Sequence, residues 1–106
     1  MTYASISDVK WWLKHPQSDI SLDDEIGEVL ESIDAEINDT LSEYIATPVE
    51  EEDLKEVLAD IEAQWAAGVI RQRRMPEPGE EDIYVQVAKR RLERLIERRF
   101  KFLELA

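Results

Sequence analysis

The 106-residue sequence contains no cysteine, three glycines, four prolines and a single histidine. Without cysteine the chain can form no disulfide, no iron–sulfur cluster and no thiol nucleophile. No apolar run approaches the roughly 20 residues that a membrane-spanning helix needs. The first residues also lack the basic-then-apolar layout of a signal peptide. These absences favour a globular protein with no membrane partner and lean toward an intracellular origin.

Basic residues are scarce in the first two thirds of the chain. Residues 1–70 hold 18 acidic and 3 basic side chains, whereas residues 71–106 hold 7 acidic and 10 basic ones. The net charge of −12 argues against general nucleic-acid binding, because phosphates would be repelled. The two regions can pair within one molecule, or the acidic face of one copy can pair with the basic face of another. The second arrangement predicts head-to-tail assembly.

Prolines and glycines divide the chain into four segments, at Pro16, at Pro48 and at Pro76–Gly79. Apolar residues recur at spacings of three and four within each segment, and no alternating strand pattern occurs. We therefore expect helices over about 5–14, 21–45, 51–71 and 80–103. With 43% hydrophobic residues, the chain has material for one modest core. The prediction is an all-α fold, a single-domain bundle of four principal helices over 1–106, with a frayed tail over 100–106.

Local signals define the helix ends and the core. Ser5 and Ser21 are predicted N-caps, each with an aspartate three residues on (Asp8 and Asp24) to complete a capping box. The third helix is uncharged on much of two sides, which predicts a central position with neighbours on both. The expected core stripes are Ile6, Val9 and Leu13; Leu22, Ile26, Val29, Leu30, Ile33, Ile37, Leu41 and Tyr44; Leu54, Val57, Leu58, Ile61, Trp65 and Val69; and Tyr84, Val85, Ala88, Leu92, Leu95, Ile96, Phe102 and Leu103.

Signals for catalysis or metal binding are weak. His15 is a conceivable base or ligand, but no nucleophile motif, cysteine or second histidine supports it, so a solvated loop histidine is the preferred interpretation. The acidic side chains of the second helix lack the spacing of a calcium loop and lie opposite its apolar stripe. We expect no catalytic residue, no cofactor and no metal, and therefore not an enzyme.

The more informative feature is a row of like charges on the fourth helix. Arg90, Arg94 and Arg98 recur every four residues, which costs helix stability, and they adjoin Ile83 and Val87. We interpret this row as a subunit or partner interface against an acidic surface, with Glu28 and Glu31 of the second helix as the expected acceptors. We also assign Trp11 to this interface. Two adjacent indoles on a helix cannot face the same way, so one of them is expected to be partly exposed, and tryptophan is favoured at interfaces.

The order of these features resembles a known family. The residues that carry it are Tyr3-Ala4-Ser5 with Asp8-Val9-Lys10, then Asp24, Ile26 and Ala35-Glu36-Ile37-Asn38 with Leu41, then Pro48, then Leu54 and Ile61 leading to alanines and an arginine-rich end, then a last helix. Over about residues 3–98 the layout resembles the small helical head–tail connector proteins of tailed phages, also called adaptor or head-completion proteins, and related proteins of prophages and archaeal viruses.

The resemblance implies a structural virion protein. It implies a ring, typically of twelve copies, on the portal protein, where it extends the DNA channel and binds a tail or stopper protein. Its place would be the head–tail junction, and the host cytoplasm before assembly, with no sequence-specific nucleic-acid binding and no membrane. The alternative is an acidic binding module, such as a DNA mimic or an inhibitor that occupies a basic site on a host protein.

Overall fold

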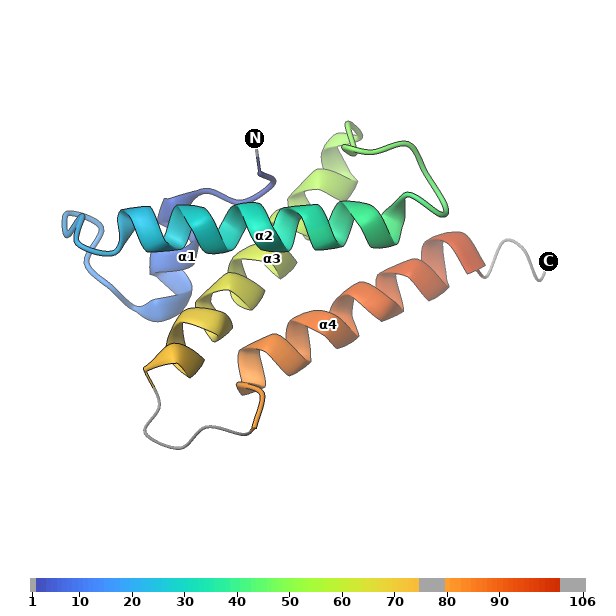
Figure 1. Cartoon of the computed structure of the whole chain (residues 1–106). Helices are drawn as coiled ribbons and strands as arrows, with labels where there is room; N and C mark the ends of the chain where they lie inside the picture. Colours follow the sequence, from blue (N-terminus) through green and yellow to red (C-terminus); the bar gives the residue numbers. More distant parts are fainter. Residues whose placement is uncertain (1, 75–79, 102–106) are drawn as a thin grey trace.

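A computed structural model describes residues 2–74 and 80–101. Within them the chain forms four α-helices and no β-strand: α1 (Ile6–Leu13), α2 (Asp23–Leu41), α3 (Glu52–Arg73) and α4 (Ile83–Ile96), which continues as a π-helical turn, η1 (Glu97–Lys101). The chain is thus an all-α bundle of four principal helices, as predicted. Figure 1 shows α4 running back beside α3, while α2 crosses the bundle.

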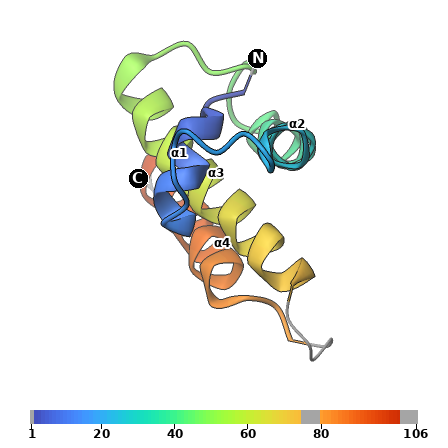
Figure 2. The same ribbon diagram turned by 90° about the vertical axis from the view of Figure 1, so that its left-hand side faces the viewer.

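Helix α3 lies at the centre of the bundle and contacts α1, α2 and α4 (Figure 2). Every residue from Ile61 to Gly68 is buried, so the helix is covered on all sides over two turns. The alanines on its reverse side let neighbouring helices approach closely, whereas its large side chains fill the space toward α2. The predicted central position is confirmed.

The predicted core stripes are confirmed for most positions. Six α2 residues (Ile26, Val29, Leu30, Ile33, Ile37 and Leu41) and four α4 residues (Val85, Ala88, Leu92 and Ile96) are buried. Val57 is an exception, because it lies at the edge of the α3 stripe and is 42% exposed. The predicted core residues Phe102 and Leu103, most of the predicted frayed tail and the whole Pro76–Gly79 connection lie outside the described residues.

The capping prediction is correct for α1 and wrong for α2. Ser5 and Asp8 form the full capping box of α1. Ser21, however, lies before Leu22, the residue that precedes α2, and α2 has no side-chain cap. The Ser21 amide instead donates to Asp19 Oδ1 at 2.9 Å, which makes a local turn. Asp23 then begins the helix and forms an ion pair with the buried Lys10 of α1 at 2.7 Å.

Two helices are shorter than predicted. The structure ends α2 at Leu41 rather than near Ile45, and Ser42 Oγ donates to the carbonyl oxygen of Asp39 at 2.6 Å in its last turn. Helix α4 begins at Ile83 rather than Glu80, because Asp82 is its N-cap and accepts a hydrogen bond from the Tyr84 amide. In both cases a short polar side chain bonds to the backbone and competes with helix extension.

The packing of α4 on α3 depends on Gly68. A Cβ at this position would lie 2.6 Å from Val85 Cγ2 and 2.8 Å from the Val85 backbone nitrogen, so only glycine allows this approach. Gly27 of α2 has no neighbouring atom within 4 Å of the equivalent point. The two helical glycines therefore have opposite environments.

We predict that Gly68→Ala destabilises the fold by about 1–3 kcal/mol through overpacking. Gly27→Ala, its matched control, should stabilise the fold by about 0.5–1 kcal/mol, because alanine loses less backbone entropy in a helix. Thermal melting followed by circular dichroism tests both. Equal melting temperatures for the two variants would contradict the close contact between α3 and α4.

Candidate partner-binding surfaces

The arginine row lies on the outer face of α4. The buried residues of this helix face α3, and helical geometry places Arg90, Arg94 and Arg98 on the opposite side, where all three are exposed. Ile83 begins the same face and is 54% exposed, while Val87 is half-buried. These five residues, named here the α4 outer face, form one continuous surface as the sequence predicted.

Most of the other basic residues in the C-terminal third form ion pairs within the molecule. Of the ten from 71 to 106, six are paired: Arg71 with Asp82, Arg73 and Arg74 with Glu25, Lys89 with Glu81, Arg91 with Asp60, and Arg99 with Glu51. Within residues 2–74 and 80–101, the three arginines of the row and Lys101 form no ion pair. The charge asymmetry of the chain is therefore partly resolved inside the bundle, and the α4 outer face is what remains.

The Arg74–Glu25 pair joins the basic C-terminal region of the chain to its acidic N-terminal region. Arg74 donates to both carboxylate oxygens of Glu25, at 2.8 and 3.2 Å, which joins the end of α3 to the start of α2. The hydrogen bond from Arg74 lowers the pKa of Glu25, although burial of the carboxylate opposes this shift. This geometry is the bidentate form that arginine favours with carboxylates.

The predicted acceptor residues lie on the solvent-exposed face of α2. Glu28 and Glu31 are exposed on the side of α2 opposite its buried stripe, together with Asp24, Ala35 and Asp39. This α2 outer face has negative charge but no large apolar side chain. Ion pairs made on such a surface contribute only about 0–1 kcal/mol each.

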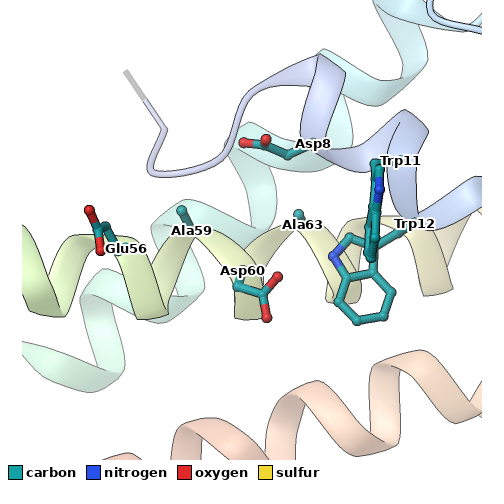
Figure 3. Close-up of a pocket in the computed structure, with 7 residues that line it drawn as sticks. All are labelled: Asp8, Trp11, Trp12, Glu56, Ala59, Asp60 and Ala63. Atoms are coloured by element: carbon teal, nitrogen blue, oxygen red, sulfur yellow. The ribbon is translucent and has the colours of Figure 1, made fainter.

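Trp11 borders a groove that the sequence did not reveal. The groove has a volume of about 390 Å³ and lies between α1 and α3. Figure 3 shows the two tryptophans at one end, Glu56 at the other, and Asp8 and Asp60 on opposite sides of a floor made by Ala59 and Ala63. Trp11 is 69% exposed and Trp12 half-buried, so the predicted divergence of the two indoles is confirmed.

The only histidine lies in the loop after α1. His15 Nε2 is 3.1 Å from Asp19 Oδ2, four residues on, in a half-buried local pair. In the described part of the chain, no three His, Asp or Glu side chains come together as metal ligands would. A membrane-crossing helix is also absent from these residues, since every helix there is too short or too polar to form one.

A buried polar network fastens the N-terminal segment to α2 and α3. Glu62 of α3 has no exposed surface, and its Oε1 accepts a hydrogen bond from the Ala4 amide at 3.1 Å. The Tyr3 amide donates to Asp34 of α2 at 3.2 Å, and the Tyr3 hydroxyl donates to Asn38 Oδ1 at 2.5 Å. The same hydroxyl accepts from the Val49 amide at 2.8 Å. Three distant parts of the sequence therefore meet here.

Burial, and next a hydrogen bond to Asp34, raise the pKa of Glu62 to about 9, against the opposing effect of the Ala4 amide. Glu62 is therefore neutral at pH 7, which lets its second carboxyl oxygen donate to Asp34. Strongly shifted pKa values are common at catalytic sites, but a carboxyl with no exposed surface cannot reach a substrate. We interpret the Glu62 network as structural.

Sequence reasoning missed both Glu62 and the groove. A signal existed for Glu62, which lies four residues after Leu58 and four before Ala66, beside the apolar stripe of α3. The groove had no such signal, because Asp8 and Trp11 come from α1 whereas Glu56 and Asp60 come from α3. Only the packing of the two helices brings them together.

Comparison of the chain with protein-family models, with curated proteins and with solved structures found no match. The function is therefore inferred from the charge and exposure of the surfaces described above. The resemblance to head–tail connectors stays a prediction.

The Glu62 network predicts a specific pH dependence of stability. Glu62 binds its proton more tightly in the folded chain, where its pKa is about 9, than in the unfolded chain, where its ordinary pKa is 4.5. Its contribution to the free energy of unfolding is therefore fully present below about pH 4.5 and is lost as the pH rises through about 9.

We predict that Glu62→Gln melts at a higher temperature than the wild type at alkaline pH, with a difference that grows from about pH 5 to about pH 9. Glutamine keeps an oxygen for the Ala4 amide and an amide group for Asp34 but does not titrate. Asp53→Asn, at an exposed position of the same helix, is the matched control for the loss of one carboxylate. Parallel curves for Glu62→Gln and the wild type would show that the carboxyl is not protonated in the fold.

Proposed function

We propose that this protein is a non-enzymatic structural connector, which self-associates through the α4 outer face. The observation that carries the proposal is that Arg90, Arg94 and Arg98 form no ion pair within the described residues, whereas six nearby basic residues do. Like charges four residues apart cost a helix about 0.2–0.5 kcal/mol per pair. An interface that neutralises the row would offset this cost.

The composition of the α4 outer face supports binding rather than simple solvation. Arginine is enriched at interface hot spots, and its aliphatic stem can cover apolar surface while the guanidinium pairs with a carboxylate. Ile83, 54% exposed, and the half-buried Val87 supply apolar area beside the row. The second copy supplies the acidic surface, since residues 1–70 carry most of the negative charge.

The resemblance to head–tail connectors suggests the assembly in which this self-association takes place. In the proposal the copies form a ring on a portal protein, extend the DNA channel and bind a tail or stopper protein, in the virion. Exposed acids on the α2 outer face would repel DNA in such a channel and let it slide. The ring, the portal and the virion rest on the resemblance.

The alternative function is an acidic module that occupies a basic site on another protein. Its support is the α2 outer face, where Asp24, Glu28, Glu31 and Asp39 are all exposed. The two functions differ in assembly. A connector associates with copies of itself, whereas an inhibitor or DNA mimic stays monomeric and binds a basic protein such as a nuclease or repressor.

We predict that reversing Arg90, Arg94 and Arg98 to glutamate leaves the monomer helical but weakens self-association strongly. Light scattering and sedimentation over a range of concentrations at moderate salt measure this, with electron microscopy to detect rings. The control reverses Lys14, Lys55 and Lys101, which changes the net charge equally, breaks no ion pair between helices and leaves the row intact. The proposal is wrong if both triple variants associate as the wild type does, or if the wild type itself stays monomeric.

A further inference from the structure

Trp11 and Trp12 form an aromatic wall at one end of the groove. The indole of Trp11 meets that of Trp12 edge-on, with ring centroids 5.4 Å apart, and Trp12 meets Tyr84 in the same way at 5.4 Å. Arg71 lies over the other side of the Tyr84 ring, 4.1 Å from its centroid. Trp11 therefore has an aromatic neighbour on one side, while most of its surface stays exposed. Exposed tryptophan is a favoured anchor for a partner side chain.

The acidic side chains of the groove favour a cationic partner group. Three carboxylates line it, and within the described residues only Asp60 has a basic partner, Arg91 of α4, at 2.6 Å. Arg91 also donates to Gln64 at 2.8 Å. One guanidinium of this chain thus already lies at the edge of the groove. Asp8 and Glu56 form no ion pair in the part of the chain that the structure describes. Indole faces and carboxylates together favour a guanidinium group.

Within the described residues, no arginine of the row pairs with a groove carboxylate of its own chain. Arg91 faces α3 and binds Asp60, whereas Arg90 is turned about 100° and Arg94 about 60° away from it, toward the solvent side of α4. The row of a second copy can approach the groove from outside. From Arg90 to Arg98 the row spans about 12 Å, and from Glu56 to Ala63 the groove spans about 10 Å, at 1.5 Å per residue. The two surfaces are therefore similar in length and opposite in charge.

We propose that the groove between α1 and α3 is the acceptor for the α4 outer face of a second copy, with an arginine of the row placed between Trp11 and Glu56. This inference rests on the proposed self-association and names its binding site. It favours the groove over the α2 outer face, because the groove combines carboxylates with two tryptophans, whereas the α2 outer face has no large apolar side chain. Indole and carboxylate groups together suit a guanidinium better than carboxylates alone on a solvated helix face.

Site-specific cross-linking tests this placement, because the chain has no cysteine of its own. Val87→Cys marks the α4 outer face, Ala59→Cys marks the groove and Ala35→Cys marks the α2 outer face, and none of the three removes a charge. A mixture of Val87→Cys and Ala59→Cys proteins should give a cross-linked heterodimer with a short bis-maleimide, identified by mass spectrometry. The matched mixture of Val87→Cys and Ala35→Cys proteins should give at least about tenfold less.

The cross-linking outcomes separate the groove from the proposed function. Preferential cross-linking to position 35, or none to position 59 in a protein that still associates, overturns the groove as acceptor and leaves self-association standing. Loss of association in the triple arginine variant tests the function independently. Failure of the wild type to associate overturns both proposals.

A second measurement uses the exposed tryptophan. Trp11→Ala combined with Glu56→Lys should weaken self-association by about tenfold or more, as loss of a hot spot does. Glu28→Lys combined with Glu31→Lys, on the α2 outer face, should weaken it by less than the groove variant does. The reverse ranking overturns the groove assignment. Circular dichroism of each monomer confirms that the variants stay folded.

Discussion

The structure depends on the packing of three helices around α3. This arrangement requires a helix that is apolar or small on nearly its whole circumference, and residues Ile61 to Gly68 meet the requirement with no exposed position. Gly68 admits α4 at a distance that no other residue allows, and alanines admit α1. The same alanines leave a shallow floor where α1 ends, so the groove beside Trp11 follows from the way the core is built.

Glu62, the one ionisable residue buried in this central helix, has a structural role. Glu62 ties the N-terminal segment to α3 through the Ala4 amide, and Asp34 and Asn38 hold Tyr3 from α2. A neutral carboxyl suits this position, because an ionised one without a cation would be strongly destabilising when buried. Burial and the neighbouring carboxylate together keep the proton on Glu62. The start of α1, and with it the position of Trp11, is anchored through this network.

The charged side chains fall into two groups, those with an ion-pair partner within the described residues and those without one. Arginines at the end of α3 bind the first turn of α2, and Arg91 binds α3, so much of the charge asymmetry is used to hold helices together. The α4 outer face carries positive charge without a described partner, and the groove carries negative charge beside an exposed indole. The proposed self-association joins these two surfaces.

The sequence by itself determined the helix count, the core stripes and the position of the arginine row, because helical periodicity fixes which residues share a face. It also determined the cap of α1, where Ser5 and Asp8 interact locally. Tertiary structure decided the start of α2, where Asp23 binds Lys10 of another helix. It also decided the burial of Glu62 and the convergence of Trp11 with Glu56. These features join residues tens of positions apart, and no local pattern encodes which helices meet or at what distance.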